Sequence, residues 1–320
     1  MKKIFYMMFF AAGIFASCTD DDYTQMSSPN DGNIITFATN SGNTQTRAGQ
    51  TATSVSQFDV SAVTSDGAPF FTSLKFKYNS NGGFFESTPT YYWPASKSLN
   101  FYAVNVPGTI SFNTSNIPSY LYTNWNGEND LVAAVVKSGV KQNPYPLQFQ
   151  HICSQIHVSF EANDKANALT YKVVGLKMTA PSSGTYSFGN VTGGSGAWRI
   201  TDTNTSEYSY SSALPFTFAH NVSKARLDGC YWNILPVADG NIVFKVEYVV
   251  LQNGQVVSDF TGSNAKQCTI TQPKLVMGKK YCYNFSLTHT SDNEIKFSTS
   301  IMNWADEYTT NQYPETPTTK

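Results

Sequence analysis

The chain is poor in charge, and in arginine above all. Charged side chains make up 13% of its 320 residues, and the three arginines are Arg47, Arg199 and Arg226. Soluble domains ordinarily carry about 25% charged residues. A net charge of −1 with so few arginines argues against a nucleic-acid-binding protein, which would be basic. Aromatic residues make up 14%, which argues against a disordered chain.

Motifs of catalysis and cofactor binding are missing as well. The chain contains no G-x-S-x-G, no G-x-x-x-x-G-K-[ST] and no H-E-x-x-H. His151 and His157 could share one face of a strand, but no carboxylate lies near them in the sequence, so we favour hydrogen bonding over a metal site. The acids Asp239 and Glu247 are interpreted as surface charges rather than as a glycosidase pair. We predict no catalytic residue, metal, cofactor or nucleic-acid partner.

Long apolar runs are scarce, and the one clear example stands near the start of the chain. Residues 4–16 are almost entirely apolar and follow two lysines. This run is shorter than the about 20 residues that a bilayer span needs, so it is typical of a secretory signal peptide. The following Ala16-Ser17-Cys18 is similar to a bacterial lipobox, and an ordinary signal peptide is the alternative. We predict removal of residues 1–17 and a lipid on Cys18 that anchors the protein in the outer membrane.

Cysteines are few, and none has the C-x-x-C spacing of a zinc site. Outside the cytoplasm, the four cysteines after Cys18 could form disulfides in three connectivities. A body of this size does not need disulfides for stability. We favour free, mostly buried thiols for most of the four, which are Cys153, Cys230, Cys268 and Cys282.

Short runs of aromatic and β-branched residues between turn residues are abundant. This pattern predicts strands along the whole chain, for example at residues 34–38, 73–78, 99–106, 171–178, 242–251, 279–287 and 295–304. No window of twelve residues has a convincing helical period. The two prolines of Asn143-Pro144-Tyr145-Pro146 break regular structure between two groups of strands. We therefore predict an all-β chain with two antiparallel β-sandwich domains in series.

A series of short motifs runs along the chain. They are the lipobox at Cys18, Thr46-Arg47-Ala48, Trp93-Pro94 before residues 99–103, Phe149-Gln150-His151 before residues 154–156, Gly278-Lys279-Lys280-Tyr281, and the closing Ile295, Ile301 and Trp304. In this order and spacing they resemble fimbrillins, the subunits of lipoprotein-derived (type V) pili, over nearly the whole chain. The resemblance implies transthyretin-like sandwiches, export as a lipoprotein, trimming by an arginine-specific protease and polymerisation with other fimbrial subunits by strand exchange.

The resemblance assigns a role to the first strand and to the loop after it. Ile35 and Phe37 would lie on one face of this strand and Ile34 on the other. The strand would fill the groove of its own subunit until the chain is cut between Arg47 and Ala48, which lie in a polar loop that is easy to cut. The alternative is that Arg47 is merely a solvated loop residue.

The last strand would be the donor end of the subunit. Ile295, Phe297 and Ile301 alternate with polar residues, so one face of this strand is mostly apolar and could fill a groove. The alternative is an ordinary closing strand of the second domain. The expected organisation is then a signal peptide (1–17), a tether with the first strand and cleavable loop (18–50), two β-sandwich domains (51–146 and 147–304) and a polar tail (305–320).

Two other functions stay open. The rings of Tyr91-Tyr92-Trp93 could stack on sugars, which would suit a surface-tethered adhesin, either a tip or an accessory subunit, that binds glycan or protein on a host or bacterial surface. We favour burial of these rings in a sandwich core. A glycan-processing enzyme is a remote third interpretation.

Overall fold

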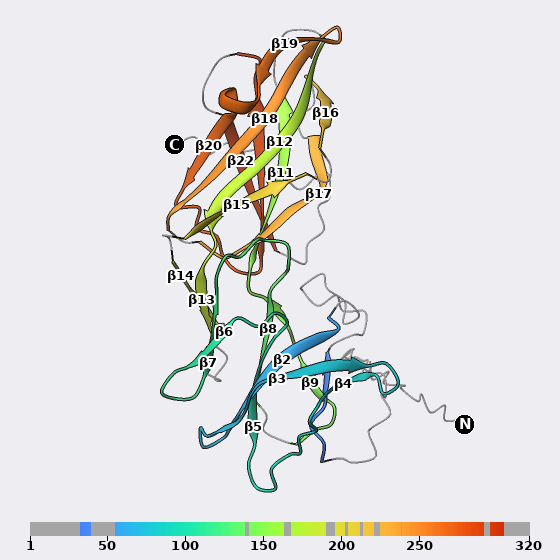
Figure 1. The fold of residues 1–320 in the computed structure, drawn as a ribbon, viewed down its shortest axis with the longest axis vertical. Coiled ribbons are helices and arrows are strands. Elements are labelled where there is room, and N and C mark those ends of the chain that lie inside the picture. The colour runs from blue at the N-terminus through green and yellow to red at the C-terminus, as the bar shows by residue number, and fades with distance from the viewer. Residues whose placement is uncertain are drawn as a thin grey trace, which may run out of the picture.

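The computed structural model describes residues 33–39, 55–137, 141–162, 168–189, 196–201, 204–211, 214–220, 225–237, 239–290 and 295–303. These residues form strands β1 to β22 and one short 3₁₀ helix, η1 (Gly262–Asn264). The prediction of an all-β fold is confirmed. Figure 1 shows an elongated molecule, with an N-terminal body below and a C-terminal body above. Among these residues, no helix has the length and apolar character needed to cross a membrane.

The N-terminal body is built on one eight-stranded sheet, the N-terminal sheet, of order β10-β8-β5-β2-β3-β4-β1-β9. Neighbouring strands run antiparallel except β1 and β9, which run parallel. Its strands are β1 (Phe37–Thr39), β2 (Gln57–Thr64), β3 (Pro69–Asn79), β4 (Phe84–Ser87), β5 (Leu99–Val104), β8 (Val132–Lys137), β9 (Tyr145–Leu147) and β10 (Gln150–His151).

This sheet curls around an aromatic core. The ring centroid of Phe101 on β5 lies 5.0 Å from that of Phe37 on β1 and 5.7 Å from that of Tyr145 on β9. Yet three strands, β2, β3 and β4, lie between β5 and β1 in the order of the sheet. The two ends of the sheet therefore face each other across a core of buried phenylalanines and aliphatic residues.

The C-terminal body contains two sheets packed face to face. One has the order β17-β11-β21-β22, and the other has the order β15-β12-β18-β19, with β16 also pairing with β12 and β20 with β18. The Phe244 ring on β18 lies 5.0 Å from the Phe285 ring on β21, so side chains of both sheets share one core. The strands are β11 (Ser154–Ala162), β12 (Leu169–Pro181), β15 (Thr205–Tyr210), β16 (Phe216–Ala219), β17 (Ala225–Ile234), β18 (Asn241–Gln252), β19 (Gln255–Phe260), β20 (Lys266–Thr271), β21 (Lys279–Leu287) and β22 (Lys296–Asn303).

A four-stranded bridging sheet of order β14-β13-β7-β6 lies between the two bodies (Figure 1). Its strands are β6 (Thr109–Phe112), β7 (Pro118–Tyr122), β13 (Gly184–Ser187) and β14 (Ala197–Ile200). Its central pair joins β7 to β13, which belongs to the later half of the chain. Strands β9 and β10 also carry the N-terminal sheet past residue 146. The domain boundary at 146/147 stays a prediction, and hydrogen bonding crosses it at both places.

Hydrogen bonds from two tryptophans hold the joint between the bodies. Trp125 Nε1 donates to the carbonyl oxygen of Asn233 at 2.6 Å. Trp198 Nε1 donates to the carbonyl oxygen of Ile152, also at 2.6 Å. Each bond connects residues of different sheets or loops, and such bonds require a fixed geometry. The joint therefore aligns the two bodies along one axis.

A buried acid–base pair lies in the same joint. His151 Nδ1 lies 2.6 Å from Asp130 Oδ2, and the two side chains are only 2% and 10% exposed. Burial raises the pKa of the Asp130 carboxyl, and His151 opposes this rise. The Cys153 thiol, buried nearby, has its pKa raised by burial and by the charge of Asp130. This thiol is therefore held in its protonated form.

Three of the four cysteines of the body are buried, as expected: Cys153, Cys268 and Cys282. None of these three forms a disulfide with another described residue. The side chain of Cys230 lies outside the described residues.

Candidate functional site

Residues 33–39, which we call the inserted segment, lie within the N-terminal sheet. Strand β1 of this segment pairs antiparallel with β4 at Phe37 and Phe85, and parallel with β9 over its whole length. In Figure 1 it is the blue strand beside β9. Strand β9 pairs with no described strand other than β1. The inserted segment therefore connects β9 to the rest of the sheet.

Hydrogen bonds extend this pairing beyond β1. Three backbone bonds of 2.8 Å run from Ile35 N–H to the Tyr91 carbonyl, from Trp93 N–H to the Asn33 carbonyl, and from Tyr145 N–H to the Thr36 carbonyl. The Thr36 hydroxyl donates to the side-chain oxygen of Asn143, and the Lys141 ammonium donates to that of Asn33. The segment is thus bonded on both of its edges.

The side chains of the inserted segment fill the core. Ile35 is 1% exposed and Phe37 is 0% exposed, while Ile34 is half-buried and bridges to Tyr92. The rings around Phe37 are those of Phe76, Phe101 and Phe58, with centroids at 4.7, 5.0 and 6.1 Å. Burial of each large apolar side chain stabilises the fold by about 1.5–3 kcal/mol. Of the strand predicted at residues 34–38, the structure forms β1 at Phe37–Thr39 and an isolated bridge at Ile34. The two main anchors of the inserted segment are Ile35 and Phe37.

The space between β4 and β9 that this segment occupies is called the insertion groove. It is lined by rings of five different strands, those of Phe58, Phe76, Phe85, Phe101 and Tyr145. An empty groove would expose these rings together with unpaired N–H and C=O groups on both β4 and β9. Such open strand edges readily pair with another chain.

Arg47, Ala48 and Cys18 lie outside the described residues. The inserted segment is joined to β2 through residues 40–56, and Arg47 and Ala48 belong to this connection. Strands β1 and β2 are not neighbours in the sheet, because β4 and β3 lie between them. A cut in this connection therefore separates two strands that are not paired with each other.

The predicted donor strand, β22, lies in the C-terminal body at the edge of its sheet, paired antiparallel with β21. Ile295 is 5% exposed, whereas Phe297 and Ile301 are 39% and 62% exposed. The Phe297 ring lies 6.0 Å from Tyr283 and 6.4 Å from Phe285. The structure does not bring this strand to the insertion groove of its own chain, and Trp304 lies outside the described residues.

The sequence of the chain is similar to that of a known protein family. A family model described as fimbrillin-like matches residues 39–304, which is most of the chain. The chain belongs to the fimbrillin-like family. As a member of this family, it is a fimbrial protein of the cell surface. The match begins at Thr39, the last residue of the inserted segment.

Solved structures of proteins from two Bacteroides species are similar to the fimbrillin-like chain. A fimbrial protein from Bacteroides vulgatus has a TM-score of 0.57 at 16% identity, with 85% of this chain and 99% of that chain covered. A putative cell adhesion protein from Bacteroides uniformis has a TM-score of 0.49 at 17% identity, with 86% and 99% covered. No curated protein matches the chain. The first of these similarities supports the β-sandwich fold.

The aromatic run of the fimbrillin-like chain does not form one platform. Trp93 is buried against Phe101 and Tyr145, Tyr91 is half-buried, and Tyr92 is 52% exposed. The burial favoured from the sequence for all three rings is confirmed for Trp93 and is wrong for Tyr92, which is exposed. The two histidines weighed as metal ligands have other partners, because His151 pairs with Asp130 and the His157 ring is hydrogen-bonded to Gln155.

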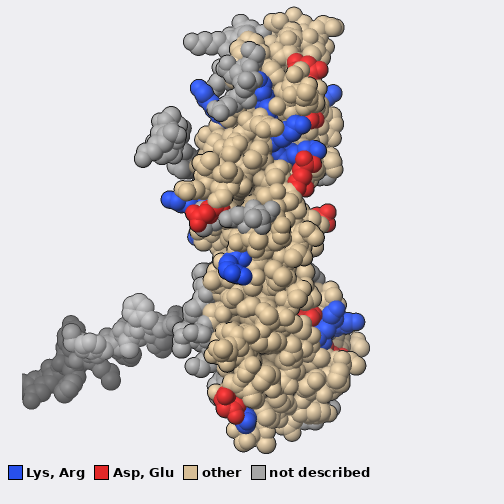
Figure 2. Space-filling view, turned by 60° about the vertical axis from the view of Figure 1, so that its left-hand side comes forward, with Lys and Arg blue, Asp and Glu red and all other residues tan. Residues whose placement is uncertain are grey.

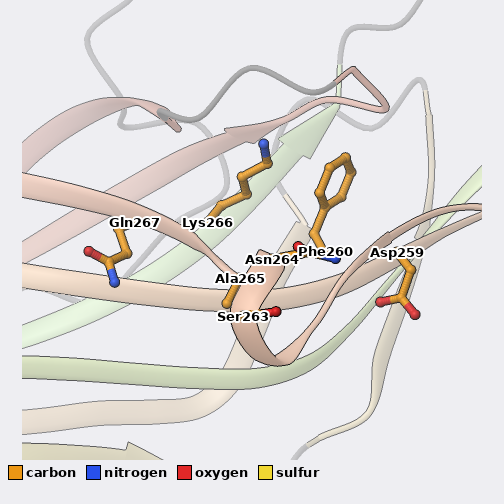
Figure 3. A pocket seen from close by; sticks show the side chains of 7 residues that line it. All are labelled: Asp259, Phe260, Ser263, Asn264, Ala265, Lys266 and Gln267. Atoms are coloured by element: carbon orange, nitrogen blue, oxygen red, sulfur yellow. The ribbon is translucent and has the colours of Figure 1, made fainter.

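A hollow of about 490 Å³ lies at the bend between β19 and β20. Figure 3 shows that Lys266 and Phe260 rise on one side of the bend, whereas Asp259 and Gln267 point elsewhere. The Lys266 ammonium lies 4.5 Å from the centre of the Phe260 ring and covers it. These polar groups do not converge on one point, so the hollow offers no set of groups for a reaction. No group of three or more His, Cys, Asp or Glu side chains in the described part of the chain could hold a metal ion.

Charged side chains are sparse on the surface of the N-terminal body. Figure 2 shows a face on which uncharged residues cover most of the lower half of the molecule. This follows from the 13% of charged residues in the chain.

Proposed function

We propose that this fimbrillin-like chain is a structural subunit of a surface fimbria that is held inactive by its own inserted segment. The observation that carries the proposal is the position of that segment between β4 and β9, with Phe37 fully buried. A strand of another subunit can take this place only after the segment has left. The subunit therefore stays monomeric while the segment is bound.

Cleavage between Arg47 and Ala48 is the proposed trigger. The connection 40–56 is the covalent link between the inserted segment and β2. While the link is intact, the segment returns to the groove at a high effective concentration after each opening. A cut leaves its contacts unchanged but allows it to diffuse away. An arginine-specific protease is thus a partner in assembly, and it needs no access to the core.

Strand exchange then joins the subunits. The empty groove offers unpaired edges and a cluster of phenylalanine rings, and a strand of another copy restores both by β-augmentation. In this proposal, residues 295–304 supply that strand. The exchange replaces similar contacts, so its driving force comes from loss of the cut segment from the groove.

In this proposal, the lipid on Cys18 anchors the uncut precursor. The signal peptide 1–17 directs export, and the lipid on Cys18 holds the precursor in the outer membrane, upstream of the cut. Cleavage after Arg47 separates the lipidated segment from the sandwich body. The same cut therefore frees the subunit from its anchor and opens its groove.

The test uses the folded precursor, purified in detergent and treated briefly with an arginine-specific protease. We expect one cut after Arg47, release of the segment and growth of polymers visible by electron microscopy. Arg47→Ala should stay intact and monomeric under the same treatment, and Arg199→Ala, matched in residue type, should behave like the wild type. Polymers from Arg47→Ala, or a trimmed wild type that stays monomeric and binds glycan, would contradict the proposal; the latter would favour an adhesin.

A further inference from the structure

The outward face of β11 and β17 carries a connected set of polar and aromatic side chains. Every second residue of each strand contributes to the core of the C-terminal body, and the residues between them point to the other face of the sheet. Outward residues of the two strands stand opposite each other in their antiparallel pairing, Gln155 with Asn233 and His157 with Tyr231. These two adjacent rows are called the β11–β17 face.

Hydrogen bonds fix the inner part of this face. Gln155 Nε2 donates to Asn233 Oδ1 at 3.2 Å, and His157 Nε2 lies 2.6 Å from Gln155 Oε1. An amide oxygen only accepts, so the proton in the second contact belongs to His157. Gln155 and Asn233 are 8% and 2% exposed, and the Asn233 carbonyl also accepts the bond from Trp125 in the joint. The two amides are therefore held in one arrangement.

Two rings lie at the outer end of this network. The centroid of the His157 ring lies 5.6 Å from that of Tyr231, and the ring planes are inclined by 32°. His157 is half-buried, whereas Tyr231 is 46% exposed. The Tyr231 ring thus rests on a histidine whose orientation is set by a buried amide. An aromatic surface that is fixed before a ligand arrives loses little entropy on binding.

The chemistry of the β11–β17 face suits a sugar ring. One side of a hexose ring presents C–H groups, which can pack against an aromatic ring, and its hydroxyls both donate and accept hydrogen bonds. The Tyr231 phenol does the same, and Lys280, placed beside Gln155 by the pairing of β11 with β21, adds a donor on the same face. A peptide is recognised by a free strand edge or by a groove, whereas β11 is paired on both sides.

We propose that the β11–β17 face is a glycan-binding site. Tyr231 stacks on a hexose ring, and its hydroxyl and Lys280 hydrogen-bond the sugar hydroxyls. His157 supports the Tyr231 ring from behind, while Gln155 and Asn233 position His157. The site lies in the C-terminal body, away from the insertion groove, so it does not rest on the proposed function. On a fimbria the site would recur in every subunit, and many weak contacts then give strong attachment.

The test uses immobilised gastric mucin, whose glycans contain galactose, as the probe. The protein is the uncut full-length precursor in detergent, so that polymer formation plays no part. We expect the precursor to bind mucin but not the same mucin after enzymatic removal of its glycans. An excess of free galactose should release it, whereas an equal concentration of mannitol, a polyol without a ring, should not.

Three variants locate the site. Tyr231→Ala should weaken mucin binding at least about tenfold, because the stacking ring is lost, whereas Tyr231→Phe keeps the ring and should stay within about threefold of the wild type. The matched control is Tyr78→Ala, which removes a 47% exposed ring from β3 in the N-terminal body and should bind like the wild type. Equal urea midpoints of Tyr231→Ala and the wild type would show that the variant is folded.

The results that would overturn the site are distinct from those that bear on assembly. A wild-type precursor that does not bind mucin, or that binds deglycosylated mucin equally well, would overturn it. So would wild-type binding strength in Tyr231→Ala, or release by mannitol as effective as release by galactose. Each of these results leaves the proposed role of the inserted segment standing, because the segment stays uncut in every sample.

Discussion

The core around the inserted segment and the joint between the two bodies are held together by different interactions. Around Phe37 the contacts are between apolar rings, and the buried indole nitrogen of Trp93 has no hydrogen-bond partner among the described residues. In the joint, Trp125 and Trp198 donate short hydrogen bonds to defined carbonyl groups. Ring contacts tolerate a change of partner, whereas hydrogen bonds demand fixed geometry. Exchange therefore suits the first region and rigidity suits the second.

The largest effect on stability is expected from Phe37→Ala. This change removes a fully buried ring from the insertion groove and should lower the free energy of unfolding of the precursor by about 3–5 kcal/mol. Urea denaturation of the uncut precursor measures it. Phe112→Ala, at a 38% exposed phenylalanine, is the control and should cost less than about 1 kcal/mol. Equal losses in the two variants would mean that the segment does not fill the core.

A pair of tryptophan variants sharpens the contrast between the two regions. Trp125→Phe leaves the Asn233 carbonyl without its donor, whereas Trp93→Phe removes an N–H group that has no partner in the described part of the chain. Both variants replace tryptophan by phenylalanine, so the loss of side-chain volume is the same. Trp125→Phe should therefore cost about 1–3 kcal/mol more in the free energy of unfolding. If urea denaturation shows that Trp93→Phe lowers the free energy of unfolding more than Trp125→Phe does, our account of the joint is wrong.

A smaller, pH-dependent effect is expected in the joint. Burial raises the pKa of Asp130 above its ordinary value of 3.8, although His151 opposes this. The folded state then binds this proton more tightly than the unfolded state, so the carboxyl stabilises the fold most below pH 3.8 and loses this contribution as the pH rises through its folded-state pKa. The free energy of unfolding of Asp130→Asn, compared with that of the wild type at the same pH, should therefore rise between pH 4 and pH 7. A difference that stays constant with pH would refute this.

The smallest effect on stability is expected from Cys18→Ala, because Cys18 belongs to neither region. The free energy of unfolding should stay within about 0.5 kcal/mol of the wild type, as for substitutions away from packed sites. Labelled palmitate should enter the wild-type protein in cells but not this variant. Equal labelling of both would show that the lipid is attached elsewhere or is absent.

Local patterns in the sequence were enough to predict much of the fold. The alternation of residues 34–39 indicates a strand with Ile35 and Phe37 on one face, and both side chains are buried. The strand predicted at residues 279–287 is β21 with the same bounds. These predictions succeed because both segments are rich in β-branched and aromatic residues, which favour strands, although both faces of each segment are largely buried.

The joint could not be predicted in this way. The bond from Trp125 to Asn233 joins residues 108 positions apart, and the pairing of β7 with β13 joins Tyr120 to Tyr186. Neither leaves a local pattern, since the partner of each group is fixed by the path of the whole chain. The domain boundary was placed at a pair of prolines for the same reason, although strands on both sides of it belong to one sheet.

The two-sided enclosure of the inserted segment has a mechanical consequence. A strand between β4 and β9 is hydrogen-bonded along both edges. A force pulling along such a strand stretches the bonds of both ladders at once, so they must break together rather than one after another. Survival under such a force depends on the rate of unfolding rather than on equilibrium stability. A fibre joined through this groove would therefore resist shear far longer than one joined by a strand laid along a single open edge.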